Sequence, residues 1–495
     1  MIDVAGRKTP KIGLGTRLIY GSGSLAFGAK DNGLQTILLI FYSQAVGVPV
    51  GFVSAAIAFV LVADAFIDPI VGQTSDNLKT RWGRRHPFMY GAAIPLAITY
   101  FFLWLPPQGS HVMQMVYLAL VLMVSRTLIS CYEIPSSALV AELTEDYHTR
   151  TTLLSFRYVF GWVGGLSMYL LAYNVFLINP QTHHLDLLYR PGYAQYGLAA
   201  AILMVTAIFI SAGGTHRLIP WLRKPPVENR TLGQLAGDMV STLRHRSFLM
   251  MLGVGVFAAM GQGIGFTLNP YFVNYFWHLT PPQLSTLIIQ AGVGAFGSTI
   301  VAAFVSRALG KKRAAMTLMA SSVLIGAVPM TLRLFGVMPP NSTWELTWVL
   351  FAFGCVTSPM GIGASILVSS MIADVVEDSE LRTGKRSEGL FFSAAAFVSK
   401  AISGMGVLGA GLILFAIAFP PHAAPGHVDA PILRNLALLY IPVTIGLYAV
   451  AITFMSFYKI SKTTHEDNLR KLAEDELAAA ERLGEPEPVP RVGGI

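Results

Sequence analysis

Charged side chains are scarce in this sequence of 495 residues, because Asp, Glu, Lys and Arg together make up only 13% of it. Soluble chains carry about twice that share. The two cysteines, Cys131 and Cys355, lie in apolar runs, which excludes a disulfide framework and a metal-ligand spacing. The sequence also lacks a phosphate-binding loop and a nucleophile–base pair, so we predict neither ATP-driven transport nor an enzyme.

Apolar residues are abundant instead, at 53% of the chain, and the mean hydropathy is +0.56. About 20 consecutive apolar residues are needed to cross a bilayer as a helix. The sequence therefore predicts an all-α membrane protein with twelve transmembrane helices. The predicted spans are 18–46, 53–73, 87–104, 113–139, 151–176, 196–212, 248–277, 284–306, 314–335, 347–376, 389–419 and 433–457.

The basic residues follow a regular pattern along the chain. The net charge of +8 is not gathered into one patch, so nucleic acid is not a predicted partner. Lys and Arg recur before the first span and in alternate loops, whereas the intervening loops contain almost none. Basic loops remain in the cytoplasm, which predicts an inner-membrane protein with both termini cytoplasmic.

A polar stretch at 213–247 is the longest internal loop and divides the chain into two blocks of six helices. Two such halves are typical of the major facilitator fold, whose solute site lies between the halves at mid-membrane. The predicted divisions are a cytoplasmic N-terminus at 1–17, six-helix bundles at 18–212 and 248–457, the linker at 213–247 and a cytoplasmic tail at 458–495.

Two carboxylates, Asp64 and Asp68, interrupt the apolar run from 53 to 71. At a spacing of four residues they lie on one face of a helix. A carboxylate in the middle of a membrane costs at least a few kcal/mol, and two neighbouring carboxylates repel each other. We therefore predict that a cation visits this pair.

The predicted spans hold further ionisable residues, and such groups usually pair or line a wet transport path. These residues are Lys30, Asp31, Arg126, Glu133, Arg157 and Lys400. Together with Asp64 and Asp68 they comprise four acids and four bases, so structural salt bridges are the alternative interpretation. Arg126 stands two turns before Glu133 on the same helix face, which makes it the strongest candidate for a structural role.

Charged residues also lie at the predicted cytoplasmic edge of the membrane. Asp76, Arg84 and Arg85 follow the second span and predict a gate that holds one conformation and releases in the other. Asp374, near the end of the tenth span, predicts a second gate with the basic residues at 382–386. Ordinary anchoring by positive charge is the alternative for the first group, and a solvated loop for the second.

Several motifs resemble the glycoside–pentoside–hexuronide:cation symporters, whose best-known members are the melibiose carriers. The most specific is the run D-A-F-I-D-P-I-V-G at 64–72, followed by R-W-G-R-R-H-P-F at 81–88. The likeness extends through Y-G-S-G-S-L-A-F-G-A-K-D at 20–31, Y-E-I-P at 132–135, the region of Arg157, and A-D-V-V-E-D at 373–378 as far as Lys400. It covers nearly all of the membrane portion.

The resemblance implies roles for particular residues. It assigns cation binding to Asp64, Asp68 and Ser130, and solute binding to Lys30, Asp31, Glu133 and Arg157. Lys400 matches a lysine close to the cation site that couples the two halves. We also predict a coupling role for Arg126. Ile67 replaces an asparagine that melibiose carriers use for sodium, which favours a proton. Ser137 and Ser365 replace two tryptophans of their sugar site, which disfavours galactosides.

The sequence thus predicts a secondary transporter that moves a small solute, a sugar or glycoside, together with H⁺ or Na⁺ and without a cofactor. One alternative is a cation-coupled transporter of lysolipids or other amphiphiles, since vertebrate lysophospholipid transporters share the broad family. Another is a membrane sensor or scaffold that transports nothing and keeps its intramembrane charges fully paired.

Overall fold

The computed structural model describes residues 12–144, 146–222, 237, 246–383 and 388–458. Within these ranges the chain is helical and forms no β-strand, apart from one isolated antiparallel bridge between Ile178 and Leu185. Eleven helices of the described part are long and apolar enough to cross a membrane. The prediction of an all-α membrane protein is confirmed.

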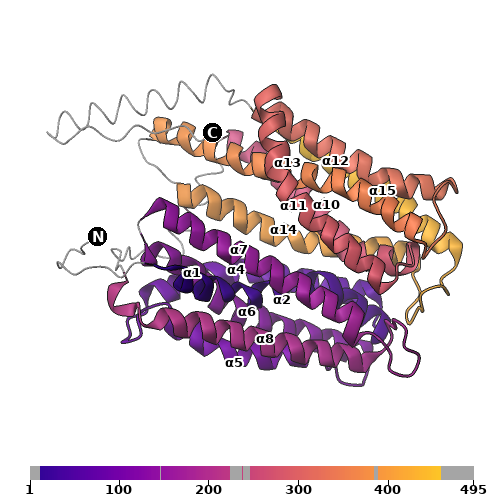
Figure 1. Cartoon of the computed structure of the whole chain (residues 1–495), viewed down its shortest axis with the longest axis horizontal. Coiled ribbons are helices and arrows are strands. Elements are labelled where there is room, and N and C mark those ends of the chain that lie inside the picture. The colour runs from indigo at the N-terminus through magenta and orange to yellow at the C-terminus, as the bar shows by residue number, and fades with distance from the viewer. Residues whose placement is uncertain (1–11, 145, 223–236, 238–245, 384–387, 459–495) are drawn as a thin grey trace. The chain divides into compact units, whose positions relative to one another are not determined.

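The helices before the longest internal loop are α1 (Leu14–Ser22), α2 (Ser24–Asp31), α3 (Leu38–Ile40), α4 (Val50–Asn77), α5 (His86–Leu103), α6 (His111–Leu143), α7 (Tyr147–Leu171) and α8 (Arg190–His216) (Figure 1). Those after it are α10 (Arg246–Tyr271), α11 (Pro281–Leu309), α12 (Lys311–Leu334), α13 (Trp344–Thr383), α14 (Glu388–Ala416) and α15 (Ala430–Ser456). Helix α8 runs four residues beyond the predicted end of the sixth span at 212.

The first predicted span is broken into short helical pieces, which is why it is absent from the eleven long helices. Gly23 separates α1 from α2, and π-helical turns at Asn32–Ile37 and Phe41–Ala45 stand on either side of α3. Glycines allow neighbouring helices to approach it closely. A Cβ atom on Gly23 would collide with the hydroxyl of Tyr132 on α6, and one on Gly28 with the carbonyl of Gly161 on α7. With these pieces counted as one segment, the described chain is consistent with twelve spans.

The chain forms two compact units. Unit 1 comprises Met1–Arg230, Gly263–Ser285 and Ser403–Leu436, and unit 2 comprises Thr231–Gln262, Thr286–Ile402 and Ala437–Ile495. Helices α10, α11, α14 and α15 therefore each belong partly to both. These units are defined by packing, whereas the predicted six-helix halves follow chain order, so the predicted boundaries at 213–247 remain a prediction.

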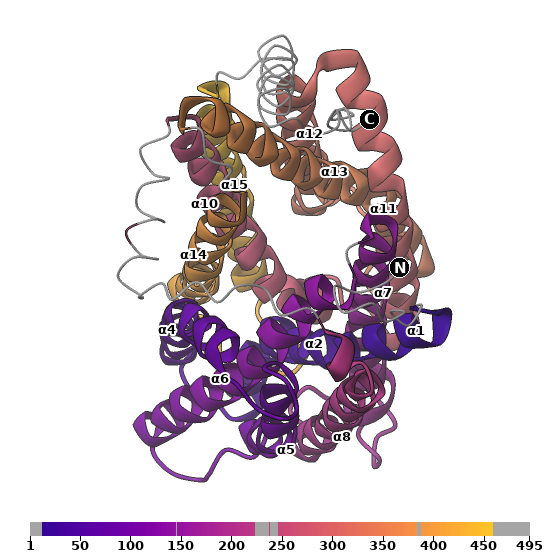
Figure 2. The same cartoon turned by 90° about the vertical axis from the view of Figure 1, so that its left-hand side faces the viewer.

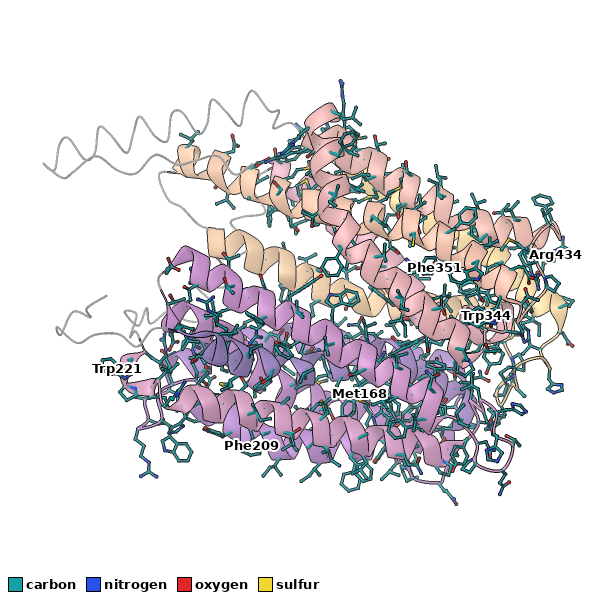
Figure 3. The ribbon with its side chains drawn as sticks, in the orientation of Figure 1. Met168, Phe209, Trp221, Trp344, Phe351 and Arg434 are labelled. Carbon is teal, nitrogen blue, oxygen red and sulfur yellow. The ribbon has the colours of Figure 1, made fainter. Side chains whose placement is uncertain are left out.

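Within unit 1, α5 packs against α6 and α8, α4 packs against α6, and α2 packs against α7 and α8 (Figure 2). Met168 on α7 is buried, whereas Phe209 on α8 points away from the bundle (Figure 3). On α4, Phe59 and Phe66 are likewise exposed, by 65% and 60%. Large exposed apolar side chains over much of a surface indicate contact with lipid.

The first and seventh spans end in the same way. Each finishes in a π-helical turn, Phe41–Ala45 in the first and Phe272–Phe276 in the seventh. A residue with positive φ follows closely in both, Gly47 at 86° and His278 at 48°. Such a correspondence is expected when two halves of a transporter are structural repeats.

Neutral hydrogen bonds join these two span ends to the loop after α14, all within unit 1. Ser43 and Tyr271 share a hydrogen bond of 2.6 Å between their hydroxyls. The backbone N–H of Ala423 donates to Gln44 at 2.9 Å, and Tyr275 donates to the Ala423 carbonyl at 2.9 Å. These side chains are buried, so this end of unit 1, which we call the aromatic end, is closed.

Unit 2 is built around the pairing of α12 with α13. Its core contains Phe248, Met251, Leu318, Met371 and Met455, all at most 3% exposed. At its edge the Lys312 ammonium donates to the carbonyls of Ser456, at 2.6 Å, and Tyr458, at 2.8 Å. A lysine on the last carbonyls of a helix is a stabilising cap, here for α15.

Candidate cation and solute site

Helix α4 carries the two carboxylates on its inner side. Asp64 is fully buried, at 0% exposure, and Asp68 is half-buried. Phe59 and Phe66 occupy the outward side of the same helix. Because a helix repeats every 3.6 residues, the apolar residues turn towards lipid while the carboxylates turn towards the neighbouring helix α6.

Two side chains of α6, Arg126 and Ser130, lie one turn apart and contact the carboxylates. The three predicted cation-site residues, Asp64, Asp68 and Ser130, therefore lie together. Ser130 donates to Asp68 Oδ1 at 2.7 Å and lies 3.4 Å from Asp64 Oδ1, so its hydroxyl bridges the two acids. Arg126 Nε donates to Asp64 Oδ2 at 2.8 Å. A hydrogen bond between ionised groups is about twice as strong as a neutral one. Asp64, Asp68, Ser130 and Arg126 are called the acidic-pair cluster below.

The position of Arg126 along its own helix suggested Glu133 as its neighbour. The structure instead directs the guanidinium across to α4, where it meets Asp64. The pair is well shielded from water, with side-chain exposures of 10% for Arg126 and 1% for Asp64. In such surroundings an ionised group is retained only when it is paired and hydrogen-bonded.

The predicted solute residues Lys30 and Asp31 form an ion pair of 2.7 Å at the end of α2. The Lys30 ammonium also lies 4.3 Å from the centre of the Phe27 ring, a cation–π contact. Lys30 is buried, whereas the Asp31 side chain keeps 28% exposure. The carboxylate is therefore the more accessible member for a polar solute.

Arg157 on α7 is held mainly by hydroxyls. Its guanidinium donates to Ser136 at 2.7 Å and to Tyr20 at 3.2 Å, and Tyr20 in turn donates to the Ser136 carbonyl at 2.6 Å. Glu133, one turn before Ser136, lies close enough for its charge to act on Arg157. The supporting roles of Tyr20 and Ser136 were not predicted, because hydroxyls on separate helices leave no signal in sequence spacing.

The predicted gate residues, Asp76 in the last turn of α4 and Arg84 and Arg85 after it, form an ionic cluster around Glu142 of α6. Arg84 and Arg85 both contact Glu142 Oε1 at 2.8 Å. Arg85 also pairs with Asp76 and donates to Ser75 at 3.0 Å. We call Asp76, Arg84, Arg85 and Glu142 the edge cluster.

Glu142 was not among the predicted gate residues. A signal existed, because Glu142 follows the predicted end of the fourth span at 139 and so lies at the same membrane face as Arg84 and Arg85.

Two further predicted residues, Asp374 and Lys400, belong to unit 2. Asp374 is paired with Lys311 at 2.7 Å. Residues 384–387 and the side chain of Arg382 lie outside the described part, so the second gate is not tested. Lys400 is half-buried on α14, and its predicted closeness to the acidic pair in unit 1 remains a prediction.

Comparison with known proteins identifies the family. A sequence model of the family described as MFS/sugar transport protein matches residues 19–462. An uncharacterized symporter of Synechocystis is 25% identical, over 93% of this chain and 97% of that protein. The isoprimeverose transporter of Lactiplantibacillus pentosus is 24% identical, over 94% and 93%.

Among solved structures, a mutant of the nucleoside transporter NupG superposes with a TM-score of 0.61 at 14% identity, covering 90% of this chain and all of that one. This likeness shows the fold alone. The family match extends over most of the chain, and the resemblance to glycoside:cation symporters is confirmed. The chain therefore belongs to the MFS/sugar transport family and is a multi-pass membrane transporter of the major facilitator type, not an enzyme.

Proposed function

We propose that this protein carries a sugar or glycoside across the cell membrane together with a cation, H⁺ or Na⁺, by alternating access. The acidic-pair cluster is the observation that carries the proposal. Asp64 and Asp68 lie on one helix face and are bridged by Ser130. Two neighbouring carboxylates in an apolar span are stabilised when a cation is bound and strained when it leaves. A transporter can use this difference to drive its cycle.

The solute is held by Lys30, Asp31, Glu133 and Arg157 in this proposal. Carboxylates accept hydrogen bonds from sugar hydroxyls, and the guanidinium donates to them. The names of the relatives, a symporter and an isoprimeverose transporter, support a glycoside as the solute. By linkage, bound solute must tighten cation binding by the same factor as bound cation tightens solute binding.

The proposed orientation places both termini and the edge cluster at the cytoplasmic face of the inner membrane. The distribution of Lys and Arg supports this orientation. The edge cluster then serves as a gate on the cytoplasmic side, and the aromatic end closes the opposite side. Rocking between the two access states requires each closure to form and break in turn.

The test is uptake into membrane vesicles with an imposed pH or Na⁺ gradient. The panel contains glycosides, free pentoses and hexoses, hexuronides and a lysophospholipid. A gradient of one pH unit supplies about 1.4 kcal/mol per proton, which corresponds to roughly tenfold accumulation at one-to-one coupling. We expect Asp68→Asn to abolish this accumulation while solute exchange across the membrane continues. The matched control is Asp429→Asn, in an exposed loop, which should accumulate solute normally.

Three outcomes contradict the proposal in different ways. Undiminished accumulation by Asp68→Asn rejects the cation assignment. Uptake of the lysophospholipid in place of every sugar rejects the solute class and favours the amphiphile transporter. Transport of nothing by a correctly inserted wild-type protein favours a sensor or scaffold.

A further inference from the structure

The Arg126 guanidinium donates to one carboxylate oxygen of the fully buried Asp64, at 2.8 Å. We propose that Arg126 determines the ion selectivity of the acidic-pair cluster, because it replaces a metal ion as the counter-charge of Asp64 and thereby excludes Na⁺ and Li⁺. The inference rests on the proposed function in one respect, namely that the acidic pair is the coupling-cation site. Of the two coupling ions that the proposed function allows, it excludes Na⁺.

Both oxygens of the Asp64 carboxylate face side chains of α6. Oδ2 accepts from Arg126 Nε at 2.8 Å, and Oδ1 lies 3.4 Å from the Ser130 hydroxyl, which donates more closely to Asp68 at 2.7 Å. A hard metal cation needs several oxygen ligands directed at it simultaneously. One of the two Asp64 oxygens is already the acceptor of a charged donor.

The charges around Asp64 disfavour a bound metal ion, as the geometry does. The formal charges of Asp64, Asp68 and Arg126 sum to −1, whereas the two carboxylates alone sum to −2. A metal ion bound between the carboxylates would lie next to the guanidinium, and like charges repel strongly where water is excluded. The Asp64 side chain is 1% exposed and that of Arg126 10%, so solvent offers little screening.

Two interpretations of Arg126, as a purely structural salt bridge and as a determinant of ion selectivity, predict different results when it is replaced. If Arg126 only joins α4 to α6, its removal weakens the protein without creating affinity for any ion. If Arg126 stands in for a metal ion, its removal takes away a positive charge that contacts the buried carboxylate of Asp64. Na⁺ should then occupy the vacated place and restore stability.

The experiment uses the purified full chain in detergent. We would measure the thermal unfolding midpoint in about 100 mM NaCl, LiCl or choline chloride, a concentration at which surface charges are largely screened, together with binding of radioactive sodium. Wild type should show the same midpoint in all three salts and no specific sodium binding. Arg126→Gln should bind sodium at about one ion per chain, with a midpoint at least about 2 °C higher in NaCl than in choline chloride.

Two further variants serve as controls. Arg126→Lys retains a positive charge beside Asp64 and should behave as wild type does. Arg157→Gln removes another guanidinium of unit 1, one that donates to Ser136 and Tyr20, and should gain no response to Na⁺. A Na⁺ response specific to Arg126→Gln therefore reports the vacated place beside Asp64 rather than general loosening.

Specific binding of radioactive sodium to wild type overturns the inference, and this measurement does not depend on whether any variant folds. A folded Arg126→Gln protein that ignores Na⁺ overturns it as well. The readout needs no transported solute, so it remains valid if no sugar is taken up. Failure of sugar uptake would contradict the proposed function, whereas Na⁺ binding to wild type would contradict this inference.

Discussion

The two ionic clusters of unit 1 use the same kinds of side chain in different surroundings. In the acidic-pair cluster, one guanidinium meets one fully buried carboxylate, with side-chain exposures of 10% and 1%. In the edge cluster, Arg84 and Arg85 share one oxygen of Glu142, and Asp76 keeps 53% exposure. At the edge, water can hydrate Asp76 when its partner is lost, whereas Glu142 and Arg85 are as shielded as the Arg126–Asp64 pair, at 5% and 7% side-chain exposure.

The formal charges of the two clusters differ as well. The residues of the acidic-pair cluster sum to −1, and those of the edge cluster sum to 0. A negative cluster is suited to take up a cation, and a balanced cluster is suited to hold two helix ends together. The difference fits the proposed roles of binding site and gate, and three substitutions test it.

The largest effect is expected for Asp64→Asn. The substitution removes the anionic partner of Arg126 and leaves a guanidinium buried without compensation, which costs about 3 kcal/mol or more. The thermal unfolding midpoint of the detergent-solubilised protein should fall clearly. Asp68→Asn, which changes a half-buried carboxylate that accepts from the neutral Ser130, should lower the midpoint less. Equal effects of the two substitutions would contradict the interpretation of Arg126–Asp64 as an obligatory pair.

An intermediate effect is expected for Glu142→Gln at the edge. The amide oxygen still accepts hydrogen bonds but no longer neutralises the two arginines, of which Arg85 keeps Asp76 as a second carboxylate partner. We expect a loss of about 1–2 kcal/mol. Because salt screens buried ion pairs only weakly, this loss should change little with salt concentration. The same unfolding assay at about 50 mM and about 500 mM NaCl, which differ severalfold in screening length, measures both quantities. A loss as large as that of Asp64→Asn would remove the distinction between the two clusters.

The smallest effect is expected for Asp76→Asn. This carboxylate pairs with Arg85, but its side chain is about half exposed, and surface ion pairs contribute at most about 1 kcal/mol. The unfolding midpoint should change by less than for Glu142→Gln. If Asp76→Asn proves the more destabilising of the two, Asp76 rather than Glu142 organises the edge cluster.

Much of the fold could be predicted because the hydropathy that identifies a span depends only on residues close together in the chain. An apolar run of about 20 residues can be recognised in the sequence without knowing its neighbours. The break of the first span could not be recognised in this way. Nor could the close approach of α6 at Gly23 and of α7 at Gly28, which brings together segments that lie far apart in the chain.

The candidate site likewise has features that could be predicted from the sequence and features that could not. The juxtaposition of Asp64 and Asp68 follows from helical periodicity, so it was predicted from spacing alone. The resemblance added Ser130, which the structure places between them. The partner of Arg126 was not predicted, since Glu133 is its neighbour along α6 whereas Asp64 lies on another helix.

By itself, the sequence determined that this chain is a helical membrane protein with an acidic pair on one helix face. Hydropathy and helical period depend only on residues close together in the chain. Only the tertiary structure decided which guanidinium meets which carboxylate, Arg126 with Asp64 in the middle and Arg84 and Arg85 with Glu142 at the edge. A hydrogen bond requires its atoms within about 3 Å, and helix packing sets that distance.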